Sequence, residues 1–198
     1  MSQAVEPTHR PTYADIEALP PHVNGEILGG ELFVSPRPAS RHALAASRLM
    51  GWVQNPFSVG LGGPGGWHIL HEPELSLAVD PDFDPVIPDL GGWRVETMPE
   101  LPDVARVRQV PQWVCEVLSP STHRADRIFK VPFYARAGVA HGWLIDPVGE
   151  SLEVYALRGG YWSVLSTHHG DETVRAEPFD ALPLHLGVLW GRTPPKVG

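Results

Sequence analysis

Residues 113–118 read Trp-Val-Cys-Glu-Val-Leu, an apolar run that is interrupted by one carboxylate, Glu116. The aromatic and β-branched residues predict a buried strand. Burying a charge without a partner costs several kcal/mol, so we expect a cation or strong hydrogen-bond donors to meet Glu116 inside the fold. Strand alternation places Cys115 on the opposite face, where we expect a core residue and not a nucleophile.

Two more charged residues flank this strand along the chain. The dipeptide Pro88-Asp89 precedes it, and Lys130 follows it on a predicted helix. Two acids and a lysine are the groups with which many nucleases hold Mg²⁺ and cut phosphodiesters. Asp89 also has a structural alternative, because aspartate commonly caps a turn such as one at Gly91-Gly92.

The helix that carries Lys130 is predicted to begin at Ser121 or Thr122 and to end at about Ala137. Pro132 should kink it, because proline removes one hydrogen bond and its ring clashes with the carbonyl of the fourth residue before it. Asp126, Lys130 and Tyr134 share one helical face, which could line a cleft. A surface ion pair between Asp126 and Lys130 would explain those two residues equally well.

The rest of the chain alternates helical and β patterns. Helices are expected over 13–19 and from Ser40, a possible N-cap, to about residue 54. The expected strands are 22–28, 31–35 after a Gly29-Gly30 turn, 67–70, 74–79, 86–90, 143–146, 152–155 and 161–165, with His168 and His169 in a loop. We therefore predict an α/β or α+β fold, a mixed sheet flanked by helices, in one domain over 13–190 between tails at 1–12 and 191–198.

Composition limits the classes of function. The chain has 198 residues and a formal charge of −8, which argues against a protein that coats nucleic acid but not against a local positive site. Its single cysteine excludes an internal disulfide, and the N-terminal residues lack the pattern of a secretion signal. Because no apolar run approaches the length of about 18 residues needed to span a membrane, we expect a cytoplasmic protein with no membrane function.

Several motifs occur together and in order along the chain. They are Val23-Asn24-Gly25-Glu26, Ser35-Pro36, Pro88-Asp89, the run from Glu116 to Thr122, Asp126, Lys130, the run from Tyr134 to Val139, and the run from Trp143 to Pro147. Together they resemble a putative restriction-endonuclease family, first catalogued as a bacterial domain of unknown function, within the PD-(D/E)xK nuclease superfamily. The ordered block from Glu116 to Pro147 is far more specific than any single dipeptide.

This resemblance implies a restriction-endonuclease-like fold and assigns roles to particular residues. Asp89 matches the aspartate of the superfamily, Glu116 matches the second acid, and Glu26 matches an acid from the N-terminal region. Leu118 stands where the superfamily usually has its lysine, and Lys130 matches a displaced lysine. Asp89 and Glu116 would bind Mg²⁺ or Mn²⁺, and the substrate would be DNA.

Other candidates belong to a second tier. His42 could reach a phosphate or act as an acid, although an ordinary surface position on its helix is the simpler expectation. Glu74 could reach the same site from its strand, but outward-facing acids on strands are common. His68 and His71 suggest zinc, yet the second histidine of a zincin motif is missing because Leu75 stands in its place.

Two classes of function follow. The first is a Mg²⁺-dependent endonuclease, expected as a homodimer because cutting two strands favours two sites and the tryptophans could supply an apolar interface. The second is a non-catalytic interaction or regulatory module on a nuclease-like scaffold, since a fold alone never establishes activity. A basic face would favour the nuclease, and the arginines that could build it are Arg94, Arg106, Arg108, Arg124 and Arg127.

Overall fold

A six-stranded mixed sheet forms the centre of the protein, seen here as a computed structural model that describes residues 10–21, 23–35, 39–120 and 122–193. In spatial order the strands are β10 (Tyr161–His169), β9 (Ser151–Arg158), β8 (His141–Asp146), β7 (Trp113–Val117), β5 (Leu90–Arg94) and β3 (Trp67–His71). Strands β7 and β8 pair in parallel, and every other neighbouring pair is antiparallel. The predicted mixed sheet is confirmed.

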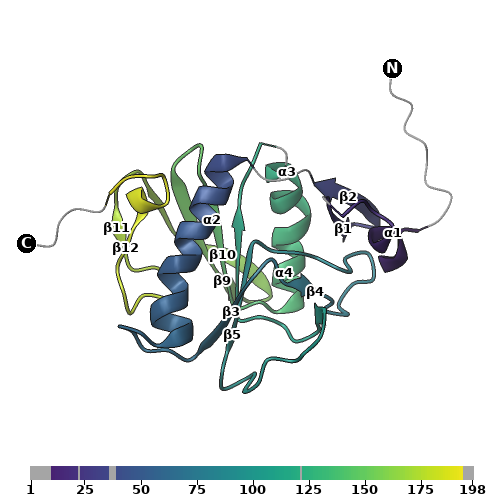
Figure 1. The fold of residues 1–198 in the computed structure, drawn as a ribbon, viewed down its shortest axis with the longest axis horizontal. Coiled ribbons are helices and arrows are strands. Elements are labelled where there is room, and N and C mark those ends of the chain that lie inside the picture. Colours follow the sequence, from purple (N-terminus) through teal and green to yellow (C-terminus); the bar gives the residue numbers. More distant parts are fainter. Residues whose placement is uncertain (1–9, 22, 36–38, 121, 194–198) are drawn as a thin grey trace, which may run out of the picture.

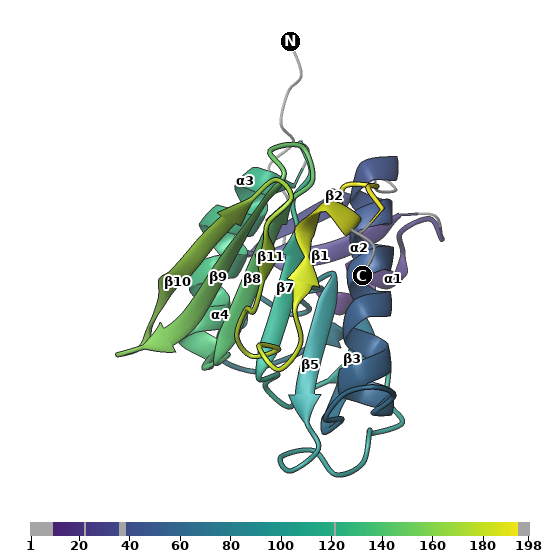
Figure 2. The same cartoon turned by 90° about the vertical axis from the view of Figure 1, so that its left-hand side faces the viewer.

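Helices cover both faces of this sheet (Figure 1). Helix α2 (Ser40–Val53) packs on one face through an apolar stripe formed by Ala45, Ala46, Leu49 and Val53. On the other face lie α3 (His123–Ala125) and α4 (Val131–Ala137), and Figure 2 shows the same arrangement from the side. The C-terminal segment, with β11 (Thr173–Val174), β12 (Leu184–His185) and a 3₁₀ turn at Leu186–Val188, packs on the α2 face.

Strand β7 separates the two faces as its sequence predicts. Trp113, Cys115 and Val117 join the core cluster beneath α2, whereas Val114 belongs to the cluster beneath α4. Cys115 is buried, which confirms its place in the core. Because side chains alternate along a strand, Glu116 faces the helices that follow β7.

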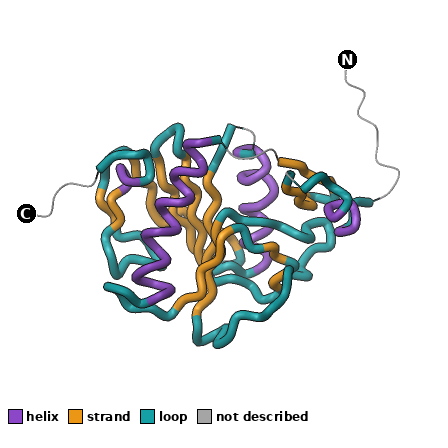
Figure 3. The backbone as a smooth tube through the Cα atoms, in the orientation of Figure 1, coloured by secondary structure: helices purple, strands orange, loops and turns teal. Residues whose placement is uncertain are grey.

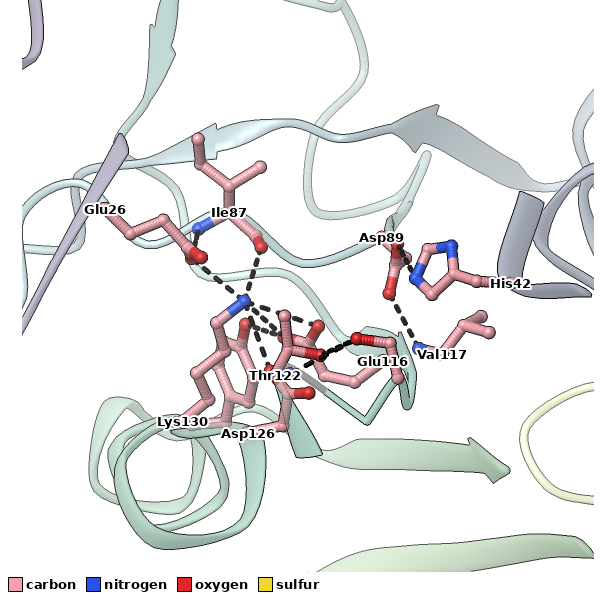
Figure 4. Close-up of polar contacts among 11 residues, drawn as sticks. Glu26, His42, Ile87, Asp89, Glu116, Val117, Thr122, Asp126 and Lys130 are labelled. Atoms are coloured by element: carbon pink, nitrogen blue, oxygen red, sulfur yellow. Dashed lines mark hydrogen bonds and ion pairs between the residues drawn. The ribbon is translucent and has the colours of Figure 1, made fainter. Parts of the chain in front are cut away.

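An antiparallel hairpin stands beside the main sheet. Its strands are β1 (Asn24–Leu28) and β2 (Glu31–Ser35), and they follow the short helix α1 (Tyr13–Glu17), whose N-cap is Thr12. Gly29 and Gly30 connect the strands with φ values of +63° and +79°, which confirms the predicted turn. The hairpin carries Glu26 towards the C-terminal end of β7 (Figure 4).

Two of the expected strands differ from the structure. The run 74–79 forms a strand only at Glu74–Leu75 (β4), which pairs with β6 (Arg106–Val107) in a separate sheet, and Ala78 turns away with a φ of +54°. In the run 86–90, Val86 forms only an isolated bridge to Leu75, and the strand itself begins at Leu90, because Pro85 and Pro88 have no N–H to donate to a ladder.

The glycines that follow Asp89 lie inside β5, so the structural alternative for Asp89, the cap of a turn before Gly91-Gly92, does not hold. A Cβ atom at Gly91 would lie 2.9 Å from Pro73, and one at Gly92 would lie 3.1 Å from the ring of Trp113. These glycines allow close packing against Pro73 and Trp113, and neither of them has the positive φ of a turn. Asp89 therefore does not cap a turn but stands at the start of a central strand.

The helices also depart from their predicted form. Ala39, not Ser40, is the N-cap of α2, and a π-helical turn at Gln54–Val59 extends that helix to Gly60, which has a φ of +82°. Thr122 caps α3, while the other predicted start of this helix, Ser121, lies outside the described residues, as do His22, Pro36 and the tails 1–9 and 194–198.

Between α3 and α4 lies a π-helical turn over Asp126–Lys130. Figure 3 draws this stretch as one helix, in purple, beside the strands of the sheet. The last hydrogen bond of the turn runs from the N–H of Val131 to the carbonyl of Asp126, five residues back. Pro132 follows immediately and cannot continue an α-helical ladder. The irregularity predicted from Pro132 is present as this wide turn, and Gly138 then ends α4 with a φ of +86°.

Strand β10 is longer than expected, and it includes His168 and His169, which pair with Leu152 and Ser151 of β9. The prediction of a loop at these histidines is therefore wrong, because the β9–β10 ladder continues past the bulge near Leu165. Among the described residues, no helix has the length and apolar character needed to cross a membrane.

Candidate functional site

Charged side chains from four separate elements meet at the C-terminal end of β7 (Figure 4). Glu26 comes from β1, Asp89 from the residue before β5, Glu116 from β7, and Asp126 and Lys130 from the π-helical turn. All five side chains are at least 86 % buried, since the most exposed of them, Glu26, has an exposed fraction of 14 %.

Lys130 is the centre of this cluster. Its Nζ atom lies 2.9 Å from Glu26 Oε1 and 3.4 Å from Glu116 Oε1. It also lies 3.7 Å from Asp126 Oδ1 and donates a hydrogen bond of 2.8 Å to the carbonyl of Ile87. Because Asp126 and Lys130 have exposed fractions of only 4 % and 5 %, a surface ion pair between them is excluded.

The lysine keeps its charge in this environment. Burial on its own lowers the pKa of Lys130, but Glu116, Glu26 and Asp126 raise it, and the net result lies well above its usual value. Lys130 is one of only two lysines in the chain. The cation that the buried Glu116 requires is therefore Lys130, despite its displacement from the usual position after the second acid.

Glu116 has a second strong partner. The hydroxyl of Tyr134 donates a hydrogen bond of 2.5 Å to Glu116 Oε1. Burial raises the pKa of Glu116 well above its usual value, Lys130 opposes this, and the neighbouring acids add to it. Burial likewise raises the pKa of Asp126. Three carboxylates, those of Glu26, Glu116 and Asp126, thus surround one ammonium, which leaves the cluster with surplus negative charge or with bound protons.

Asp89 is held from two sides at the edge of the cluster. The N–H of Val117 donates a hydrogen bond of 2.7 Å to Asp89 Oδ2, and His42 Nε2 lies 3.0 Å from Asp89 Oδ1. Leu90 pairs with Cys115 across the β5–β7 ladder, so one further step of this register brings Asp89 opposite Glu116. The two acids that the sequence singles out therefore stand on adjoining strands.

The second-tier candidates separate into two groups. Asp126, Tyr134 and His42 all join the cluster through the contacts given above. Glu74 lies elsewhere, on β4, where the hydroxyl of Tyr13 donates a hydrogen bond of 2.9 Å to it. Two participants that have no sequence signal are backbone groups, the carbonyl of Ile87 and the N–H of Val117.

A second network fixes the π-helical turn from outside. Arg127 donates hydrogen bonds from both terminal nitrogens to Glu153 of β9, and the hydroxyl of Tyr155 donates to the same carboxylate. This pairing ties the turn that carries Lys130 to the sheet. It also uses one of the five arginines that might have formed a basic face.

Replacing Glu153 with glutamine should lower the free energy of unfolding by about 1 kcal/mol at pH 7, because a partly exposed bidentate ion pair is lost. Arg127 lowers the pKa of Glu153 below its usual 4.5, so the stabilisation is present above that pH and is lost as the pH falls through the lowered value. Urea unfolding of both proteins at pH 7 and pH 3 measures this, and an equal difference at both values would contradict it.

Two of the other arginines lie against aromatic rings. Arg94 stacks on Trp67 at the end of β5 opposite to Asp89, and Arg106 stacks on the ring of Tyr13. With Arg127 paired to Glu153, three of the five arginines that could build a basic face thus have other partners.

The donor set of the cluster suits a hard cation. Among the residues described, no three or more His, Cys, Asp or Glu side chains are already arranged as a metal site. Asp89 and Glu116 nevertheless present carboxylate oxygens, the ligands that Mg²⁺ prefers, and each oxygen of Asp89 that accepts one hydrogen bond retains a lone pair. The surplus acidic charge would be offset by such an ion.

Comparisons with known proteins identify the fold and the family of the chain. A structural search finds a protein from Anabaena variabilis ATCC 29413, described as a putative nuclease belonging to DUF820, with a TM-score of 0.67 and 18 % identity over 85 % of this chain and 90 % of the other. That likeness shows a shared fold. No protein with curated annotation matches the chain. The family model described as "Putative restriction endonuclease" matches residues 11–186. The chain therefore belongs to the Uma2 family of putative restriction endonucleases.

Proposed function

We propose that the protein is a Mg²⁺-dependent endonuclease that hydrolyses phosphodiester bonds in DNA. The observation that carries this proposal is the arrangement at the C-terminal end of β7, where Glu116 lies 3.4 Å from Lys130 and Asp89 is held by the N–H of the next residue, Val117. Membership of a nuclease family supports the class of reaction. Burying more carboxylates than cations costs stability, and such strained electrostatics are typical of functional sites.

Asp89 and Glu116 would hold the cation, which would activate a water molecule and offset charge on the phosphate. Lys130 is charged and buried, so it can orient that water or stabilise negative charge as it develops on the phosphoryl oxygens. Glu26 and the carbonyl of Ile87 hold the ammonium in place. Tyr134 fixes the orientation of Glu116 by donating to one of its oxygens.

A cytoplasmic location and a homodimer remain parts of this proposal. The dimer is supported by the need to cut two strands, but not by the tryptophans. Trp67, Trp93, Trp113 and Trp143 are each at most 2 % exposed and pack in the core. Of the tryptophans, only the half-buried Trp52, Trp162 and Trp190 could contribute apolar surface to an interface.

Cleavage of supercoiled and single-stranded DNA by the purified protein, with Mg²⁺, Mn²⁺ or EDTA, tests the proposal. We expect cutting that requires the metal and is lost in Asp89→Asn. The absence of cutting under every condition, together with no binding of Mn²⁺ by calorimetry, would favour the interaction module. That alternative is supported by Arg94, Arg106 and Arg127, which contact Trp67, Tyr13 and Glu153 and not the cluster.

A further inference from the structure

His42 lies in the first turn of α2, directly against Asp89 (Figure 4). Its side chain is 12 % exposed, and Nε2 lies 3.0 Å from Asp89 Oδ1. Ala45, Ala46 and Leu49 pack the same helix onto the sheet and fix the position of the imidazole. The expectation of an ordinary surface position for His42 is therefore wrong.

With the contact from His42, each oxygen of the Asp89 carboxylate has a partner. The N–H of Val117 holds Asp89 Oδ2 from β7, and the imidazole holds Oδ1 from α2. A carboxylate fixed at both oxygens cannot rotate freely. Its remaining lone pairs are therefore aimed before any ligand arrives, and such outer supports of a ligating group tune its affinity for a metal.

The other nitrogen of the imidazole makes a purely structural role costly. His42 Nδ1 is buried and has no hydrogen-bond partner within the described part of the chain. A buried polar atom without a partner costs roughly 1–3 kcal/mol, so an apolar side chain at this position would stabilise the fold better. A group kept at a cost to stability calls for a functional explanation.

We propose that His42 is a positioning residue, which orients Asp89 so that this carboxylate can bind a divalent cation together with Glu116. The inference rests on the proposed function. His42 itself touches neither the cation nor the phosphate, and it acts through its hydrogen bond to Asp89. An alternative explanation is a structural link that joins α2 to the sheet and has no effect on the affinity for the metal.

Calorimetric titration of the full chain with Mn²⁺, without nucleic acid, distinguishes the two explanations. The variants are His42→Ala, which removes the donor, and His42→Gln, whose amide nitrogen replaces Nε2. His169→Ala is the matched control, because His169 is 80 % exposed at the end of the edge strand β10. The thermal unfolding midpoint of each variant in EDTA shows whether it is folded.

We expect His42→Ala to weaken Mn²⁺ binding by about 10-fold or more, the usual effect of removing such an outer partner. His42→Gln should bind within about threefold of the wild type, because it keeps the donor, and His169→Ala should be unchanged. If His42→Ala does not fold, the test depends on His42→Gln alone. The inference is then overturned if folded His42→Gln binds Mn²⁺ as weakly as Asp89→Asn does.

Failure of the inference can be told apart from failure of the proposed function. If the wild type binds Mn²⁺ and folded His42→Ala binds it equally well, His42 is only a structural link while the metal site stands. If the wild type binds no divalent cation, the metal-dependent function falls and this inference with it.

Discussion

Replacing Glu116 with glutamine should lower the rate of DNA cleavage by about 1,000-fold, because it removes one of the two carboxylates that hold the metal ion. Glutamine has the same shape and can still accept a hydrogen bond from Tyr134, so the fold should survive the change. The measurement is the initial rate of cleavage with saturating Mg²⁺. Glu177→Gln is a suitable control, because the side chain of Glu177 is 59 % exposed.

The same variant should be at least as stable as the wild type. Burial raises the pKa of Glu116 well above the unfolded value of 4.5, so the native state binds a proton that the unfolded state releases. Above pH 4.5 the stability of the wild type therefore falls as the pH rises, up to the raised pKa of the folded protein. Glutamine has no proton to release, so the stability of the variant relative to the wild type should grow as the pH rises from 4.5 towards the raised pKa of Glu116. A variant that is clearly less stable at pH 8 would show that Glu116 has a structural role.

Replacing Lys130 with methionine should have the opposite effect on stability. We expect the free energy of unfolding to fall by about 3–5 kcal/mol at pH 8, because removing one member of a buried ionic cluster leaves the others uncompensated. Glu26, Glu116 and Asp126 would all lose the same partner. Cleavage should also fall by about 100-fold or more, since the charge that faces the phosphate is gone.

The pH dependence of this variant is a second test. The pKa of Lys130 is raised above its usual 10.5, so its stabilisation is complete below that pH and is lost only as the pH rises through the higher value. In the methionine variant the unpaired carboxylates can take up protons as the pH falls. The difference in the free energy of unfolding between the wild type and the variant should therefore shrink between pH 8 and pH 5. Arg10→Met removes an exposed pair with Asp82 and should change stability by less than about 0.5 kcal/mol.

Local patterns were sufficient to predict the centre of this molecule. The run around Glu116 predicts a buried strand with one face towards the site, and a buried acid requires a cation. Lys130 fills that requirement in the structure. The hairpin at Gly29-Gly30 and the irregular helix before Pro132 were also predictable, because the backbone limits of glycine and proline act locally.

The parts that could not be predicted depend on contacts between distant elements. Apart from the family resemblance, no local pattern separates Glu26, which reaches Lys130, from Glu74, which accepts a hydrogen bond from Tyr13. The pattern of 74–79 alternates like a strand, but it has no partner strand beyond Leu75. The roles of the Ile87 carbonyl and the Val117 N–H are carried by the backbone, so no choice of side chain reveals them.

The central claim is that Asp89 and Glu116 hold one divalent cation beside Lys130. A crystal of the wild-type protein soaked in Mn²⁺ and measured at the manganese absorption edge tests it directly. We predict an anomalous peak at about 2.1 Å from oxygens of both carboxylates, the distance that small divalent cations keep to such ligands. A crystal saturated with Mn²⁺ that shows no peak between Asp89 and Glu116, or shows the ion held by other residues, would contradict the claim.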